Sequence, residues 1–401
     1  MANNNKHTGP NVPALRFPEF SGEWTKIKLG DLGNFFSGGT PSSSRKDFYG
    51  GEIPFIRSGE LHSDSTALSI TKEAYDSCSA KMVNKGDLLL ALYGATSGDI
   101  SISRISGAIN QAILCIRPQY MDAYFIKSLW EKHKKHILET YLQGGQGNLS
   151  SEIIKNISFF FPNSDEQVKI SRLIHIIDDR IETQSKIIEE LKTLRGALNE
   201  SLYCCCESYQ ELSLNDVGVS YSGLSGKSGN DFGSGYPFIP YTNIFTNNII
   251  DEGQLEYVQV SEEESQNSVC FGDLLMTLSS ETPEEVGIGA VYLGHKSPLY
   301  LNSFAFGIHI TRTDLVYPPY LSWLVSTKSF RKFILPYAQG STRYNLQKTD
   351  FMKAKYRFPT LGRQKAISVL LSGYSSKIEN EERVLNKYTA LKQGLIEQLF
   401  I

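Results

Sequence analysis

The 401-residue sequence lacks a long hydrophobic run, and this absence limits where the protein can work. No stretch of eighteen consecutive apolar residues is present, which is about the length that a membrane-spanning helix needs. The first residues, MANNNKH, are polar and contain no apolar signal region. We therefore expect a cytoplasmic protein that does not enter a membrane.

Cysteine is also scarce, with six residues in the chain. Three of them are consecutive, Cys204 to Cys206, which suits neither a disulfide framework nor the ligand spacing of a tetrahedral metal site. His133 and His136 could share one face of a helix, but the surrounding WEKHKKH run offers no ligand cluster that would complete a site. The sequence predicts reduced thiols and no metal site.

Catalytic and nucleotide-binding motifs are missing as well. We find no Walker motif, no nucleophile elbow, no HExxH and no N/D-P-P-Y/F tetrapeptide of a nucleotide methyltransferase. VYPPY at 316–320 lacks the Asn or Asp that would hold a target amine. The net charge of −3 argues against a nonspecific polyanion binder, so nucleic-acid binding would have to come from local surfaces. We expect a non-catalytic chain that binds no cofactor.

What the sequence does contain is an internal duplication. Several motifs recur in the same order at offsets of about 183 to 197 residues, and six ordered matches exclude chance convergence. The clearest pairs are LGDLGNFFSGG (29–39) with LNDVGVSYSGL (214–224), KGDLLLAL (85–92) with FGDLLMTL (271–278), and QGGQGNL (143–149) with QGSTRYNL (339–346). Each repeat is long enough to be a whole domain with an appendage.

Each copy changes character once along its length. Its first part mixes short β-like runs with Gly-, Ser- and Asn-rich loops and one short helix, which predicts a mixed α/β domain. Its last part has no cluster of helix breakers and predicts one long helix. The expected division is an N-terminal segment 1–22, a first domain 23–163, a first helix 164–206, a second domain 207–360 and a second helix 361–401.

Both long helices carry a heptad pattern. Ser164 and Gln167 match a capping box at the start of the first helix. Apolar residues then recur in alternating steps of four and three, which is typical of a coiled-coil seam. The predicted seam residues are Ile170, Ile174, Ile177, Ile181, Ile188, Leu191, Leu198 and Leu202 in the first helix, and Ile367, Leu371, Tyr374, Ile378, Leu385, Tyr388, Leu395 and Leu399 in the second.

A helix of roughly 55 Å overhangs a domain whose radius of gyration is about 15 Å, so it cannot bury its apolar stripe on that domain alone. We therefore expect the two helices to pair with each other; in the alternative, each packs on its own domain. The polar interruptions at equivalent steps of the two seams would then fix the register: Gln184, Arg195, Glu381 and Lys392.

Two similar domains on a rigid rod suit a ligand with two sites at a fixed spacing, and duplex DNA is the commonest such ligand. Basic, amide, hydroxyl and aromatic side chains in the loops could reach phosphates or base edges. The candidate DNA-binding residues are Arg45, Lys46, Arg57, Tyr93, Thr96, Gln143, Gln146, Asn148, Lys227, Tyr241, Asn243, Arg343, Tyr344 and Asn345. Each could equally be a solvated loop residue.

The order RFPEFSGEWTKIKLGDLG, GDLLLAL, QG…NL, FP…EQ…I and a terminal LKQGLIEQLF resembles the specificity subunit of Type I restriction–modification systems over nearly the whole chain. Arg363-Gln364 departs from the Glu166-Gln167 pair at the first helix start. The resemblance implies two similar mixed α+β target-recognition domains, each reading half of an asymmetric DNA target. It also implies an antiparallel two-helix coiled coil between them and an internal pseudo-two-fold repeat.

The same resemblance implies the partners. They are double-stranded DNA, two copies of a methyltransferase subunit and a motor-nuclease subunit, with S-adenosylmethionine, ATP and magnesium held by those partners. Two other classes remain open from the residues: a coiled-coil scaffold that joins protein partners, which would show no salt-dependent affinity for DNA, and an enzyme, which the missing motifs disfavour.

Overall fold

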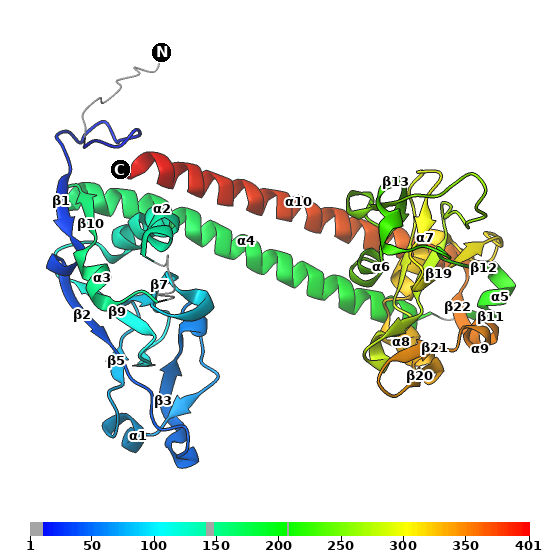
Figure 1. The fold of residues 1–401 in the computed structure, drawn as a ribbon, viewed down its shortest axis with the longest axis horizontal. Helices are drawn as coiled ribbons and strands as arrows, with labels where there is room; N and C mark the ends of the chain where they lie inside the picture. Colours follow the sequence, from blue (N-terminus) through cyan, green and yellow to red (C-terminus); the bar gives the residue numbers. More distant parts are fainter. Residues whose placement is uncertain (1–10, 142–147, 207) are drawn as a thin grey trace. The chain divides into compact units, whose positions relative to one another are not determined.

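The computed structural model describes residues 11–141, 148–206 and 208–401 (Figure 1). The chain forms two compact units. Unit 1 consists of residues 1–185 and 383–401, and unit 2 consists of residues 186–382. Each unit therefore contains one copy of the repeat together with half of each long helix. Within the described residues, no helix is both long and apolar enough to cross a membrane.

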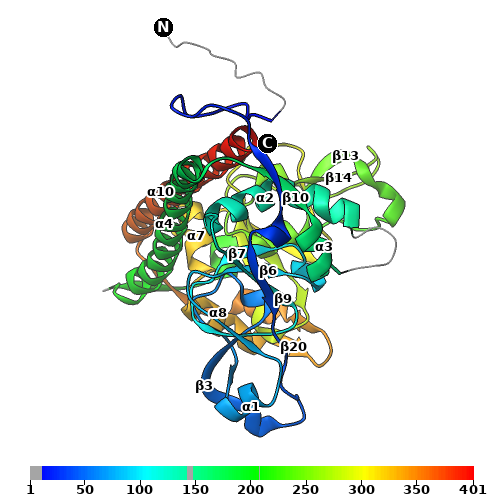
Figure 2. The same cartoon turned by 90° about the vertical axis from the view of Figure 1, so that its left-hand side faces the viewer.

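Unit 1 is built on three sheets. The first is an antiparallel pair of β1 (Thr25–Lys28) and β10 (Ser158–Phe161). The second has the strand order β2 (Gly33–Ser37), β9 (Ile113–Pro118), β6 (Leu88–Ala91), β7 (Ile100–Ile102). The third has the order β4 (Ser69–Ile70), β3 (Tyr49–Ile56), β8 (Gly107–Ile109), β5 (Lys81–Val83). Figure 2 turns this unit toward the viewer.

Unit 2 repeats this topology. β11 (Tyr209–Ser213) pairs with β22 (Lys355–Pro359), and a four-stranded sheet has the order β12 (Gly218–Ser222), β19 (Ala305–Ile310), β15 (Leu274–Thr277), β17 (Gly289–Val291). A third sheet has the order β14 (Glu256–Val258), β13 (Phe232–Ile239), β18 (Tyr300–Leu301). Unit 2 also has a small sheet in the order β16 (Ser279–Ser280), β21 (Tyr344–Leu346), β20 (Ala338–Gly340). The mixed α/β class and the duplication are confirmed.

The central strands show why the motif GDLL is kept in both copies. β6 is buried on both faces: Leu88 and Leu90 point into one cluster, whereas Leu89 and Ala91 point into another. β15 does the same, with Leu274 and Met276 on one side and Leu275 on the other. A continuous apolar run is the pattern expected of a strand covered on both faces.

The helices that cover these sheets differ between the units. Unit 1 has α1 (Lys72–Asp76), a single long α2 (Ala123–Tyr141) and α3 (Ser151–Asn156). Unit 2 has α5 (Leu214–Val217), α6 (Tyr241–Thr246), α7 (Pro318–Leu324), α8 (Lys328–Ile334) and α9 (Lys348–Lys353). The expected single helix is thus split in unit 2. The break lies at Thr327, whose hydroxyl accepts from the amide of Phe330 and caps α8.

The long helices are α4 (Ser164–Cys204) and α10 (Leu361–Leu399). In unit 1, Ile170 and Ile174 of α4 share a core cluster with Ile396 and Leu399 of α10. In unit 2, Leu198, Leu202 and Tyr203 of α4 pack with Ile367 and Leu371 of α10. The start of each helix therefore meets the end of the other, which makes the pair antiparallel. None of the predicted seam positions is exposed.

The start of α4 does not use the predicted capping box. Asn163 is the cap, because its side-chain oxygen accepts from the amide of Glu166 at 2.9 Å. The Gln167 side chain instead donates to the carbonyl of Pro162 at 2.9 Å and accepts from the amide of Asp122. Gln364 of α10 makes the equivalent bonds to Pro359 and Tyr317. These buried glutamines fasten each long helix to its own domain.

Two of the polar seam residues bond across to the other long helix. Lys392 of α10 pairs with Asp178 of α4 at 2.9 Å, and also with Glu131 of α2. Arg195 of α4 donates to Ser375 of α10 at 2.8 Å. The two bonds occupy equivalent positions at an offset of 197 residues. Arg195 and Lys392 therefore bond to polar residues beside the seam, Ser375 and Asp178.

Candidate nucleic-acid interface

Two loops meet at the same place in each unit. We call the segment after β6 or β15 the tip loop (residues 93–99 and 279–287), and residues 338–345, which lead to Leu346, the QG loop; Asn148, before Leu149, is the described residue at the equivalent place in unit 1. The amide of Leu149 donates to the carbonyl of Leu92 at 3.0 Å, and that of Leu346 donates to Leu278 at 2.8 Å. In each unit, the leucine that ends the QG motif is therefore bonded to the residue before the tip loop.

In unit 2 this meeting point gathers four of the predicted residues. Ser279 pairs with Asn345 and Ser280 with Tyr344 in an antiparallel register. The Tyr241 hydroxyl donates to the Ser279 carbonyl at 2.9 Å. Arg343 donates from Nε to the Ser279 hydroxyl at 3.2 Å.

The guanidinium of Arg343 also lies 5.4 Å from the ring centre of Phe304. The side chain of Arg343 is exposed, and no carboxylate is recorded as its salt-bridge partner among the described residues. Its charge is therefore oriented by an aromatic ring and a serine, and it remains available to an anion or a base edge.

A hollow of about 660 Å³ opens at this point, and its lining includes residues that the sequence analysis missed. They are Phe245, Ser279, Ser280, Glu281, Glu285 and Thr342. Glu281 is exposed, whereas Glu285 accepts from the Ser280 hydroxyl at 2.8 Å. The position of Glu281 and Glu285 in the loop after the shared GDLL strand could have identified these two residues, because both copies have a loop there.

A helix holds the tip loop in each unit. In unit 2, Arg331 of α8 donates to the carbonyls of Gly287, Glu284 and Val286 at 2.7, 2.6 and 2.6 Å. Burial lowers the pKa of Arg331, and the three carbonyls partly compensate for that burial. In unit 1 the Trp130 indole of α2 donates to Gly98 at 2.8 Å. The loops are thus fixed by helix side chains, which is a feature of a preformed binding surface.

The matching surface of unit 1 contains Tyr93, Thr96 and Asn148. Tyr93 precedes the short 3-10 turn Gly94–Thr96 and is exposed, as is Asn148. By the alignment of the repeats, Tyr93 corresponds to Ser279 and Asn148 to Asn345. Gln143 and Gln146 lie outside the described residues. The two units therefore differ at the start of the tip loop, Tyr93 against Ser279, and share an asparagine at the second position.

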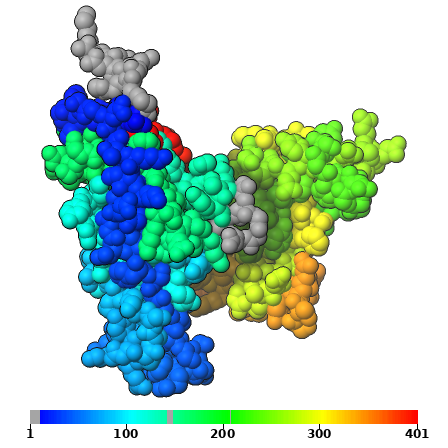
Figure 3. Space-filling view, turned by 60° about the vertical axis from the view of Figure 1, so that its left-hand side comes forward, coloured from blue at the N-terminus to red at the C-terminus, as the bar shows by residue number. Residues whose placement is uncertain are grey.

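The other basic residues predicted in unit 1 lie on a separate lobe around α1 and β3, which projects from the unit in Figure 3. Arg45 pairs with Asp47 and, at 3.4 Å, with Glu73, and the hydrogen bond from Arg45 lowers the pKa of Asp47. Arg57 pairs with Glu60 at 3.1 Å. Lys46 is exposed. These cations remain candidates for phosphate contacts, although the two arginines are already partly neutralised.

Two predicted residues have internal roles that argue against contact with DNA. Asn243 is 0% exposed, and its amide donates to the carbonyl of Asp251 at 2.9 Å and accepts from the Asp251 amide. The side chain of Lys227 is 7% exposed and forms an ion pair with Glu264. That pairing lowers the pKa of Glu264 to about 2. Sequence pattern could not distinguish these buried polar groups from surface ones.

The fold defines a class of protein: two α/β domains of the same topology, each ending in a long helix, with the two helices antiparallel. Residues 21–193 match the family model of the Type I restriction modification DNA specificity domain, so the chain carries that domain. The resemblance that its motifs suggested is confirmed.

Curated relatives agree with this assignment. The chain is 27% identical over 207 residues to the Type I restriction enzyme MjaIX specificity subunit of Methanocaldococcus jannaschii, covering 48% of this chain and 47% of the relative. It is 28% identical over 154 residues to the HindI specificity subunit of Haemophilus influenzae, covering 35% and 32%. The matches thus span about half the length of these relatives or less.

Solved structures extend the likeness in fold to nearly the whole chain. The S subunit of a Type I restriction–modification system from M. genitalium superposes with a TM-score of 0.58 at 15% identity, covering 97% of this chain and 99% of that chain. A chain from a structural study of complex assembly and conformational transition of the type I R-M system gives 0.57 at 13% identity, covering 94% and 97%.

Proposed function

We propose that this chain is the sequence-specificity subunit of a Type I restriction–modification complex. Each α/β domain would read one half of a bipartite, asymmetric DNA target. The observation that carries the proposal is the pair of equivalent loop sites, which share a scaffold but differ in side chains. A shared scaffold gives both domains the same approach to DNA, and different side chains give them different sequences to read.

The unit 2 site suggests how one base pair would be read. An arginine guanidinium matches the O6 and N7 acceptors of guanine, and a carboxylate accepts from the N4 amino group of cytosine. Arg343 and Glu281 place both groups at one hollow. We therefore propose that this hollow reads a G·C pair, with Tyr344 and Asn345 positioned for the neighbouring contacts.

The test is Arg343→Ala in the full chain, with Arg312→Ala as the matched control. Arg312 is an exposed arginine of unit 2 that pairs with Asp314. Loss of a guanine contact should weaken binding by about 1–3 kcal/mol and relax the preference at one base pair. A uniform loss over all sequences with a shallower salt dependence would instead mark Arg343 as a phosphate contact. The scaffold alternative predicts no salt-dependent DNA affinity in any variant.

The long helices also carry exposed apolar side chains outside the seam. Ile187 and Leu194 are exposed in unit 2, and Val384 and Leu391 are exposed in unit 1. The two pairs are equivalent at an offset of 197 residues. Exposed apolar residues at helical spacing are typical of a surface that accepts a partner helix. We propose that each pair docks one methyltransferase subunit, so that the complex contains two copies.

The stoichiometry can be tested by breaking one pair at a time. Ile187→Glu with Leu194→Glu, or Val384→Glu with Leu391→Glu, should each reduce the bound methyltransferase from two copies to one, as measured by native mass spectrometry. The charge-neutral control is Ile187→Val with Leu194→Val. If both double variants still bind two copies of the methyltransferase, the helices are not part of the docking surface.

We further propose that the chain itself is non-catalytic. S-adenosylmethionine, ATP and magnesium would be held by the methyltransferase and motor-nuclease subunits, and the assembly would act on DNA in the cytoplasm. The support is the lack of catalytic motifs in the sequence together with the family of the matched domain. Methyl transfer by the purified chain alone would contradict this proposal.

A further inference from the structure

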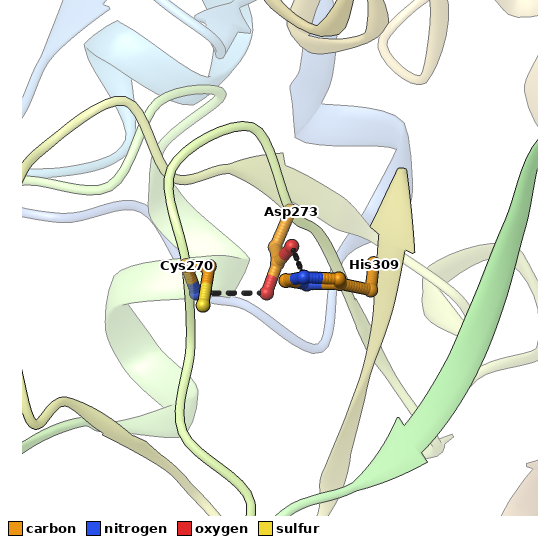
Figure 4. A group of neighbouring side chains, drawn as sticks. All are labelled: Cys270, Asp273 and His309. Atoms are coloured by element: carbon orange, nitrogen blue, oxygen red, sulfur yellow. Dashed lines mark hydrogen bonds and ion pairs between the residues drawn. The ribbon is translucent and has the colours of Figure 1, made fainter. Parts of the chain in front are cut away.

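Three potential metal ligands converge at one edge of the unit 2 sheet (Figure 4). Asp273 directly precedes β15, His309 lies on β19, and Cys270 lies in the turn before β15. The Sγ atom of Cys270, a carboxylate oxygen of Asp273 and a ring nitrogen of His309 all lie within 4.8 Å of one another. Cys270 and His309 are exposed, so an ion could enter from solvent, whereas Asp273 is buried.

The carboxylate is already oriented for a ligand. One oxygen of Asp273 accepts from Nδ1 of His309 at 2.6 Å. The other accepts from the Tyr221 hydroxyl at 2.6 Å and from the Cys270 amide at 2.9 Å. Hydrogen bonds from outside the ligand set fix the orientation of ligating side chains in metal sites. Tyr221 would supply such a bond here.

The equivalent position in unit 1 contains a permanent cation. Asp87 corresponds to Asp273, and Arg117 to His309, because Leu88 pairs with Ile116 as Leu274 pairs with Ile308. Arg117 donates three bonds to Asp87, at 3.0, 3.1 and 2.6 Å. Asn84, which corresponds to Cys270, donates its amide to Asp87 at 2.8 Å. Unit 2 has thus replaced an arginine and an asparagine by a histidine and a cysteine.

The replacement removes a permanent cation from the carboxylate. Asp87 accepts from the guanidinium of Arg117 and from the amide of Asn84. Asp273 is buried, and its hydrogen-bond donors are the Tyr221 hydroxyl, the Cys270 amide and the His309 ring. A divalent cation at this point would compensate the buried carboxylate as the guanidinium does in unit 1.

We propose that Cys270, Asp273 and His309 bind one Zn²⁺ ion, with water in the fourth position. Thiolate, imidazole and carboxylate together are the ligand types that Zn²⁺ takes in tetrahedral sites, whereas Mg²⁺ and Ca²⁺ prefer oxygen alone. On binding, Cys270 gives up its thiol proton and His309 binds through Nδ1 as the neutral ring, in place of its hydrogen bond to Asp273. The ion would link β19 to the turn before β15. The proposal does not depend on DNA binding.

The experiment uses the full chain with Cys204, Cys205 and Cys206 changed to serine, because those thiols could bind metal on their own. This background should bind one equivalent of Zn²⁺ in competition with a chromophoric chelator. Co²⁺ in its place should show a thiolate-to-cobalt charge-transfer band. Absence of stoichiometric binding, or of the band, would overturn the proposal.

Variants separate ligation from folding. Cys270→Ser should weaken Zn²⁺ binding more than about 100-fold and abolish the cobalt band, whereas Tyr221→Phe should cost roughly 10- to 100-fold. His309→Arg restores the unit 1 arrangement, so it should fold normally and bind no metal. Cys78→Ser, a cysteine of unit 1, should change nothing. Equal affinity in the background, Cys270→Ser and His309→Arg would show that the ion binds elsewhere.

Discussion

In both copies of the repeat a buried glutamine fastens the start of the long helix, but the residue before it differs. In unit 1 that residue is Glu166, which is buried and pairs with Arg16 of the N-terminal segment at 2.7 Å. In unit 2 it is Arg363, which is exposed. In each copy the glutamine donates to the carbonyl of a proline before the helix and accepts one backbone amide from its own domain. The residue before the glutamine differs because an N-terminal segment reaches the long helix in unit 1, where Arg16 pairs with Glu166.

Asp87 and Asp273 show the same contrast between a residue that both copies keep and a neighbour that differs. The carboxylate is kept in both copies because the backbone turn before the central strand needs an acceptor. The residue opposite it varies, being Arg117 in unit 1 and His309 in unit 2. The duplicated domains therefore keep the groups that bond their own backbone, Gln167 with Gln364 and Asp87 with Asp273, and differ in the residues next to them.

The largest difference between the copies should come from the residue before the glutamine. Glu166→Ala leaves the guanidinium of Arg16 buried without its carboxylate, which should cost about 3 kcal/mol of unfolding free energy. Arg363→Ala, at the equivalent exposed position, should cost less than about 0.5 kcal/mol. Urea unfolding measures both. Equal losses would mean that the N-terminal arm does not stabilise unit 1.

The glutamines themselves should behave alike. Gln167→Ala and Gln364→Ala each remove a buried side chain that bonds the backbone, so each should lower the unfolding free energy by about 2 kcal/mol. The methionine variants at the same positions fill the volume without the hydrogen bonds and separate packing from bonding. Native-state hydrogen exchange of each unit reports the loss locally. A loss confined to one unit would refute the equivalence of the two fastenings.

Much of this fold could be predicted from the sequence. The duplicated motifs mark strands that are buried on both faces, and the heptad pattern marks helix positions that are not exposed. What could not be predicted depends on tertiary contacts. The sequence predicts that Ser164 and Gln167 cap the helix together. Instead, Asn163 caps it, and the Gln167 side chain donates to the carbonyl of Pro162. The sequence pattern predicts one helix across Thr327, but the structure has two, and the Thr327 side chain caps the second.

The candidate site was predicted less completely than the fold. The sequence predicts Arg343 and its neighbours because a glycine-flanked loop with a basic and an aromatic residue has little use in a core, and their contact with DNA stays a prediction. Glu281 was missed because an acidic residue on a loop resembles ordinary solvated surface. Asn243 was included because burial of a single amide leaves no trace in the sequence pattern.

A pH experiment sharpens the comparison at Asp87. Its pKa is lowered in the folded state, so its contribution to stability is present above the ordinary value of 3.8 and is lost as pH falls through the lower folded value. Asp87→Asn should cost about 1 kcal/mol at neutral pH by removing charge-assisted bonds. It should also reduce the fall in stability as the pH drops below about 3.8. Asp64→Asn, at an exposed carboxylate of the same unit, is the control, and an unchanged acid slope in Asp87→Asn would contradict the assignment.

The smallest effect tests whether the seam bonds are interchangeable. Lys392 pairs with the carboxylate of Asp178 in unit 1, whereas Arg195 donates to the hydroxyl of Ser375 at the equivalent point of unit 2. Ser375→Asp would give Arg195 the carboxylate that Lys392 already has. Because the site is partly exposed, the gain should be about 0.5 kcal/mol and should shrink in high salt. Ser376→Asp places the same charge on the exposed side of α10 and should give no such gain. If Ser375→Asp destabilises the chain instead, the pairing geometry of unit 1 does not transfer to unit 2, and the two ends of the helix pair are equivalent in sequence position alone.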